Sequence, residues 1–135
     1  LGSQVSDLPD RRARLEAAGS AMMAQEAHLV DIAINGADGQ PGIRALPGAY
    51  IVGGPDNPCR EGLGSYAFAG IPSAEVVSAL NQRGIRTHLR KADYFSGNIL
   101  DPLEMDSCIR TSFCHYNTKA EVLTLLKALA EITQA

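Results

Sequence analysis

The last third of the chain constrains the fold most strongly, because a strand pattern there leads directly into a helix start. Residues 108–113 alternate between an apolar face and a more polar one, which is the period of a strand. Thr118 and Glu121 then have the spacing of a capping box, and apolar residues recur at helical spacing as far as Ile132. Each element buries only one face, so the strand and the helix must pack as separate layers.

The other elements follow from apolar periodicity and from the glycines and prolines that interrupt it. They are predicted to be helices over 10–34 and 73–83 and strands over 49–52, 65–69 and 85–89. Ser73 is the expected N-cap of the second helix, Gly84 its stop, and residues 90–107 are expected to be irregular. The sequence therefore predicts a single domain over residues 1–135 of class α+β. It is a two-layer sandwich in which helices cover one face of a small, mainly antiparallel sheet of about four strands.

Composition and charge exclude several classes of function. The 135 residues carry a formal net charge of -3, with 45% hydrophobic and 20% charged residues, so the chain is not a strongly basic nucleic-acid-binding protein. No apolar run reaches the roughly 18 residues that span a bilayer, and the start has no signal-peptide pattern. We therefore expect no nucleic-acid or membrane partner. Because the chain begins with Leu1 and not with Met, we expect it to be a processed or excised piece.

The cysteines indicate a reducing compartment and no metal site. Cys59, Cys108 and Cys114 do not have the spacing of zinc ligands. Unpaired thiols of this kind are typical of cytoplasmic proteins, so we expect a cytoplasmic location. Cys114 precedes His115, but neighbours on a strand point to opposite faces, which disfavours a nucleophile–base pair.

A motif around the last strand carries the most specific signal. Arg110 is followed two positions later by Ser112, then by Tyr116-Asn117-Thr118, and Glu121-Val122 opens the last helix. In this arrangement residues 15–132 resemble the C-terminal small domain of class V aminotransferases, especially the cysteine desulfurase-like (NifS-like) group. The resemblance implies a fold-type I enzyme that depends on pyridoxal 5'-phosphate (PLP).

The resemblance also implies partners that lie outside this chain. The Schiff-base lysine of the family follows a Ser/Thr and a His in a large PLP-binding domain, and Lys91, Lys119 and Lys127 lack that context. We therefore assign no catalytic, cofactor-binding or metal-binding residue to this chain. We expect its own large domain to be its partner, the full-length enzyme to be a homodimer, and the fragment to be inactive alone.

Arg110 is the residue of this chain that the resemblance connects to substrate. It implies that Arg110 binds the carboxylate of a small amino acid, a task that suits a planar guanidinium able to hold both carboxylate oxygens. His88, Arg90 and Tyr94 are secondary candidates for the wall of the site. From the residues alone, Arg110 could instead be an exposed strand residue paired with a nearby acid.

One departure from the family affects the expected reaction. Cysteine desulfurases carry a nucleophilic cysteine on the loop that corresponds to residues 90–98, and this stretch contains none. A persulfide mechanism needs a mobile thiolate, so we expect aminotransferase, lyase or epimerase-like chemistry, with transamination, elimination and epimerisation all open. The alternatives are a free-standing α+β ligand-binding or regulatory module without catalysis, or a thiol enzyme built on Cys114.

Overall fold

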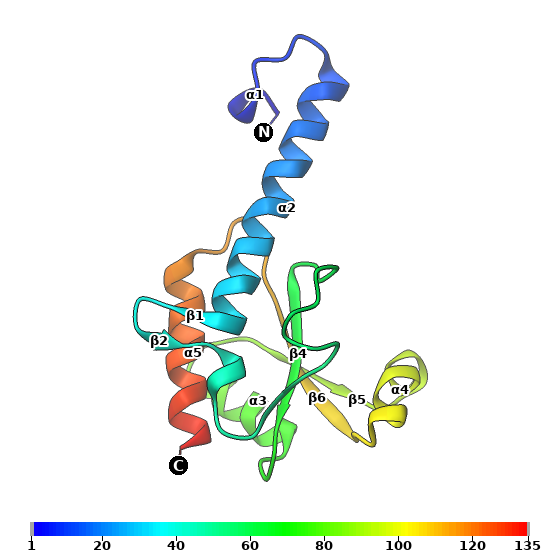
Figure 1. Cartoon of the computed structure of the whole chain (residues 1–135), viewed down its shortest axis with the longest axis vertical. Coiled ribbons are helices and arrows are strands. Elements are labelled where there is room, and N and C mark those ends of the chain that lie inside the picture. Colours follow the sequence, from blue (N-terminus) through cyan, green and yellow to red (C-terminus); the bar gives the residue numbers. More distant parts are fainter. Residues whose placement is uncertain (1, 135) are drawn as a thin grey trace.

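A four-stranded antiparallel sheet lies at the centre of the computed structural model, which describes residues 2–134 (Figure 1). Its strands in spatial order are β3 (Ala49–Ile51), β4 (Leu63–Phe68), β6 (Ser107–Ser112) and β5 (His88–Lys91). All neighbouring strands pair antiparallel, which confirms the predicted sheet. Because β6 is central and carries Arg110, the strand with the motif is held from both sides.

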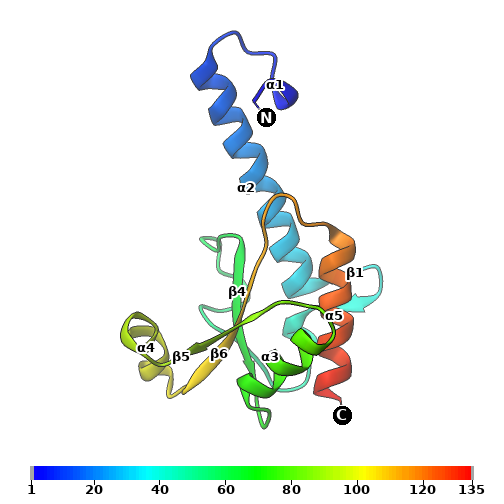
Figure 2. The same cartoon turned by 180° about the vertical axis from the view of Figure 1, so that it is seen from behind.

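Three helices cover one face of this sheet and form the second layer. They are α2 (Arg11–Asn35), α3 (Ser73–Gln82) and α5 (Lys119–Thr133). Their buried residues join Tyr66, Phe68 and Ile109 of the sheet in one hydrophobic core. Figure 2 shows the same layers from behind. The predicted α+β sandwich with helices on one face is therefore confirmed.

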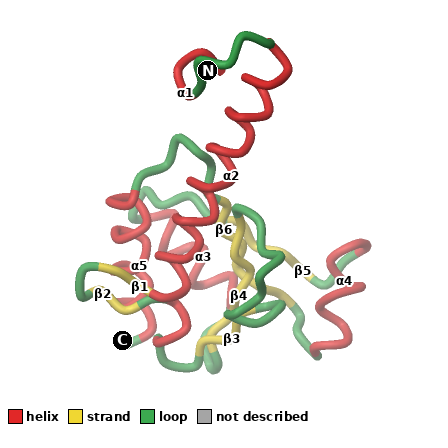
Figure 3. Tube along the Cα trace, turned by 45° about the horizontal axis from the view of Figure 1, so that its top comes forward, coloured by secondary structure: helices red, strands yellow, loops and turns green. Residues whose placement is uncertain are grey.

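The first half of α2 stands away from this body. Asp10 begins the helix by accepting a hydrogen bond from the Ala13 amide at 2.8 Å. Apart from Ala18, the buried residues of α2 begin at Leu29, and its N-terminal half contacts the short helix α1 (Gly2–Val5). Figure 3 shows α1 and this half of α2 extending beyond the sheet. Gly36, at a φ of 88° that suits glycine, ends the helix.

The segment from the start of α3 to the start of β5 differs from the prediction in two places. Pro72 occupies the N-cap of α3, and Ser73, predicted for that role, is the first helical residue and donates to the Ser107 carbonyl at 3.3 Å. Gly84 does end the helical segment, at a φ of 76°. The next strand begins at His88 and not at residue 85. The reason is that the Thr87 amide donates to the Asn81 side chain at 3.3 Å, which keeps this segment off β6.

Residues 90–107 are more ordered than predicted. They include the end of β5, helix α4 (Tyr94–Leu100) and the 3-10 helix η2 (Asp101–Leu103). Backbone contacts hold α4: the Gly97 amide donates to the Asp93 carbonyl at 2.9 Å, and the Ala92 amide donates to the Asp106 carbonyl at 2.8 Å. Because these bonds do not depend on an apolar stripe, hydrophobic periodicity gave no sign of the helix.

The capping box at the start of α5 is confirmed. The Thr118 amide donates to the Glu121 carboxylate at 2.7 Å, and the Glu121 amide donates to the Thr118 hydroxyl at 3.3 Å.

Before the sheet, a hairpin of β1 (Gly36–Ala37) and β2 (Gln40–Pro41) leads into the 3-10 helix η1 (Ile43–Ala45). Within residues 2–134, no helix combines the length and the apolar character needed to cross a bilayer.

Candidate substrate-binding face

The side of the sheet opposite the three helices is the candidate site, and we call it the open face. Strand alternation sends Ile109 into the core and its neighbours Cys108 and Arg110 to the other side. The same period places Ser65 of β4 and Arg90 of β5 on this face. The open face is therefore defined by its central residues: Ser65, His88, Arg90, Cys108 and Arg110.

The register of the three strands fixes the neighbours of Arg110. Ser65 pairs with Arg110 on one side and His88 pairs with it on the other, which gives one row across β4, β6 and β5. In the next row, Arg90 pairs with Cys108. Two of the three secondary candidates, His88 and Arg90, are thus brought to the same face as Arg110.

Tyr94, the third secondary candidate, lies elsewhere. It is the first residue of α4, beyond the end of β5, and its side chain is 93% exposed. Its φ of 30° is unusual for a residue with a side chain. Nothing in the described structure ties Tyr94 to the Arg110 row, and Figure 1 shows α4 at the far end of the sheet.

Among residues 2–134, the arginines of the open face have no acidic partner. The ion pairs in residues 2–134 involve other side chains and include none from His88, Arg90 or Arg110. Arg110 is half-buried, and its Nε is buried without a hydrogen-bond partner. This excludes, for the described residues, the alternative in which Arg110 is a strand residue neutralised by a nearby acid. A half-buried guanidinium without an acidic partner can bind the carboxylate of a ligand.

The pKa of the Cys108 thiol depends on burial and on the charges around it. Burial raises the pKa of its thiol, while a hydrogen bond with Ser65 and the positive charges of Arg90 and Arg110 oppose the rise. In the sheet, Cys108 pairs with Arg90 and lies two positions before Arg110 on the same strand. With 3% of its surface exposed, Cys108 is a packed strand residue and not a mobile nucleophile.

The thiol enzyme on Cys114 finds no support in the geometry. The adjacent His115 is engaged with Glu26, whose Oε1 accepts from the His115 amide at 3.2 Å and lies 4.0 Å from Nδ1. The Cys114 sulfur instead lies beside the Tyr116 hydroxyl, whose pKa it raises. Across residues 2–134, no cluster of three or more His, Cys, Asp or Glu side chains has the arrangement of a metal site.

The three lysines do not fit the role of a cofactor lysine. Lys91, Lys119 and Lys127 are all exposed, and the Lys119 ammonium is paired with Asp38 at 2.7 Å. A lysine that forms a covalent bond with a carbonyl cofactor needs a desolvated setting that lowers its pKa. The residues of this chain therefore fit substrate binding better than covalent attachment of PLP.

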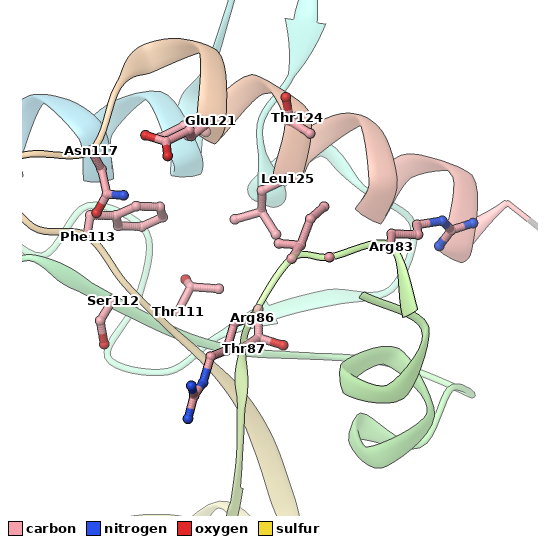
Figure 4. A pocket seen from close by; sticks show the side chains of 13 residues that line it. Arg83, Arg86, Thr87, Thr111, Ser112, Phe113, Asn117, Glu121, Thr124 and Leu125 are labelled. Atoms are coloured by element: carbon pink, nitrogen blue, oxygen red, sulfur yellow. The ribbon is translucent and has the colours of Figure 1, made fainter. Parts of the chain in front are cut away.

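A separate pocket of about 420 Å³ opens between β6, α5 and residues 83–87 (Figure 4). Thr111 reaches it from β6, Phe113 from the residue just after that strand, and Leu125 from α5, so it lies on the helix side of the sheet. The hydroxyls of Thr87 and Thr111 are buried there without hydrogen-bond partners. Arg110 does not line this pocket. The free-standing ligand-binding alternative would place its ligand here.

Comparison with known proteins shows the family. The Aminotransferase class-V family profile matches residues 16–125, and the chain belongs to this family. Its members, including cysteine desulfurases, depend on PLP in general. Over 72 residues the chain is 36% identical to a probable cysteine desulfurase of Treponema pallidum (strain Nichols), a match that covers 52% of this chain and 17% of that protein.

Solved structures show the same fold. The cysteine desulfurase CsdA of Escherichia coli, in an S-sulfonic acid form, superposes with a TM-score of 0.66 at 21% identity, over 83% of this chain and 25% of that one. The apo cysteine desulfurase of Thermococcus onnurineus NA1 has a TM-score of 0.70 at 24% identity, over 91% of this chain and 28% of that one. The chain thus spans a minor part of the length of these relatives. The predicted resemblance to class V, NifS-like enzymes is confirmed.

Sequence reasoning missed that Arg90 pairs with Cys108 and is therefore a diagonal neighbour of Arg110. The alternation of β5 and β6 was visible, but their register was not, because β5 begins three residues later than predicted. Ser65 was also missed as the neighbour of Arg110 on β4. The motif identified Arg110, and the strand pairing identifies the side chains around it.

Proposed function

We propose that this chain is the C-terminal small domain of a PLP-dependent class V aminotransferase or cysteine desulfurase-like enzyme, and that Arg110 binds the carboxylate of a small amino-acid substrate. The observation that carries the proposal is the unpaired, half-buried guanidinium of Arg110 on the open face. We call the full-length protein that contains this chain the parent enzyme. Residues 1–135 would form one domain of it.

The position of Arg110 suits orientation as well as binding. It projects from the central strand of the sheet, so its backbone is held by β4 and β5 together. A guanidinium can contact both oxygens of a carboxylate, and this fixes the rotation of the substrate in addition to its position. When bound, PLP supplies an electron sink for the bond that breaks at the substrate Cα. Arg110 would hold the substrate so that this bond is presented correctly.

The remaining parts of the enzyme would come from the large domain. The exposure of Lys91, Lys119 and Lys127 supports a cofactor lysine in that domain. The open face offers one wall of a site and leaves the opposite wall to another body. We propose that this body is the large domain, within a cytoplasmic homodimer.

The reaction proposed is transamination, elimination or epimerisation. Residues 90–98 form the end of β5 and the start of α4 and contain no cysteine. Cys108 is buried in β6, and burial raises the pKa of its thiol, so it does not meet the need for a mobile thiolate. These features support an activity other than desulfuration in this member of the family.

The test uses the parent enzyme loaded with PLP. Arg110→Gln should weaken amino-acid binding by at least about tenfold, while the cofactor absorbance after loading stays at the wild-type level. Arg110→Lys should recover only part of the loss, because an ammonium cannot replace the two-point contact. Arg83→Gln, at the end of α3 and paired with Glu131, is the matched control and should bind like wild type. Equal binding by wild type and Arg110→Gln would overturn the proposal.

A further inference from the structure

The open face carries more positive charge than one carboxylate requires. Arg90 and Arg110 are diagonal neighbours across β5 and β6, because Arg90 pairs with Cys108 and Arg110 follows Cys108 by two positions on the same face. His88 lies beside both, directly opposite Arg110. Diagonal neighbours in a sheet are about 7–8 Å apart at Cα, within the reach of long side chains. The face therefore presents two guanidinium groups that can converge on one small molecule.

The positive charges of Arg90 and Arg110 both act on the Cys108 thiol. Both act to lower the pKa of the thiol of Cys108, which pairs with Arg90 and precedes Arg110 by two positions on the same strand. Like charges held close together on a sheet repel each other. An anion placed between them would relieve this repulsion and form charge-assisted hydrogen bonds with each.

The described part of the chain does not supply that anion. The acidic residues at the ends of the adjoining strands are Glu61 before β4, Asp93 after β5 and Asp106 before β6. None of the ion pairs in residues 2–134 joins one of them to Arg90 or Arg110. The buried Nε of Arg110 also lacks a hydrogen-bond partner. The charge of Arg90 is thus available in addition to that of Arg110.

We infer that the substrate is an amino acid with a second acidic group. Arg110 binds its α-carboxylate and Arg90 binds the side-chain carboxylate. The inference rests on the proposed function, since it assigns Arg110 to the α-carboxylate. A neutral substrate would leave Arg90 without a counter-charge on this face. Arg90 is therefore the residue that selects acidic substrates over neutral ones of the same length.

The test compares succinate with butyrate, which share a carbon chain but carry two carboxylates and one carboxylate. Both are titrated into the PLP-loaded parent enzyme by calorimetry, so that binding is measured without turnover. Wild type should bind succinate at least about tenfold more tightly than butyrate, since a charge-assisted pair is worth on the order of a tenfold change. Arg90→Gln should remove most of this preference, because it should weaken succinate binding far more than butyrate binding.

Two further variants separate the possible outcomes. Arg90→Lys keeps the charge and should retain part of the preference, and Arg83→Gln, outside the open face, should retain all of it. If Arg110→Gln weakens both ligands but wild type shows no preference for succinate, the inference fails and the proposed function stands. If Arg110→Gln weakens neither ligand, the proposed function fails as well. A preference for succinate that survives Arg90→Gln would also overturn the assignment of Arg90.

Discussion

Arg110 and His88 face each other across the β5–β6 ladder, on the side of the sheet that the helices leave uncovered. Cβ atoms of directly paired residues lie about 5 Å apart, so the imidazole of His88 is the closest titratable neighbour on β5. The side chain at position 88 can therefore control whether the Arg110 guanidinium is available to a ligand.

A His88→Asp substitution should make Arg110 unavailable to the substrate. The introduced carboxylate would lie opposite Arg110 and form the ion pair that the wild-type chain lacks, so it would compete with the substrate carboxylate. We expect amino-acid binding to the parent enzyme to weaken about tenfold, as measured by calorimetry.

His88→Asn is the matched control for this substitution. It has the same size as the aspartate but no charge, and we expect binding within about threefold of wild type. If the two variants weaken binding equally, then His88 contacts the substrate itself, and competition for Arg110 is not the cause.

The extent to which sequence predicted the fold differs between elements. The strand around Arg110 and the helix after it were predictable because alternation, apolar spacing and a capping box all agree there. The start of β5 was not, because it depends on a hydrogen bond between the Thr87 amide and the Asn81 side chain six residues away. Helix α4 was missed because it is only 7 residues long and contains Gly97, which disfavours a helix prediction.

The candidate site was predictable in part for a similar reason. Arg110 was identified by a linear motif, which needs no knowledge of the fold. The placement of Arg90 beside Cys108 and diagonal to Arg110 depends on the register between two strands, and register is a property of the paired structure. Tyr94 was assigned from its place in the chain, and the strand ends before the chain reaches it.

Glycine positions allow a paired test of the backbone. Gly84 has a φ of 76° and open space where the Cβ of an alanine would lie, so Gly84→Ala should cost about 1 kcal/mol of unfolding free energy through backbone strain alone. Gly19 lies inside α2 with a helical backbone and equally open space. Gly19→Ala should therefore raise the free energy of unfolding by about 0.8 kcal/mol. Denaturant unfolding of the chain measures both. A loss at Gly19 equal to that at Gly84 would contradict the assignment of the cost to φ.

The capping box should make stability depend on acid pH. The hydrogen bond from the Thr118 amide, followed by that from its hydroxyl, lowers the pKa of Glu121 below that of an ordinary glutamate. The stabilisation is therefore complete above the unfolded pKa of about 4.3 and is lost as the pH falls through the lower folded pKa. Unfolding curves over this range should show a smaller acid-dependent loss for Glu121→Gln than for wild type. If the free energy of unfolding falls equally with decreasing pH in both proteins, the lowered pKa of Glu121 is contradicted.

Tyr66 and Thr111 provide a test of unpaired buried hydroxyls. The Tyr66 side chain is 1% exposed, and burial raises its pKa while the Thr111 hydroxyl beside it opposes the rise; neither hydroxyl makes a hydrogen bond of normal geometry with another described residue. In the unfolded chain water satisfies both groups, so folding carries the full cost of desolvating them. Tyr66→Phe and Thr111→Val should therefore leave the free energy of unfolding unchanged or raise it by up to about 1 kcal/mol. Thr118→Ala, which removes a hydroxyl that caps α5, should instead lower it by about 1 kcal/mol. A loss of that size in Tyr66→Phe would mean that its hydroxyl has a partner in the folded protein, and the Thr111 hydroxyl would be the first candidate to examine.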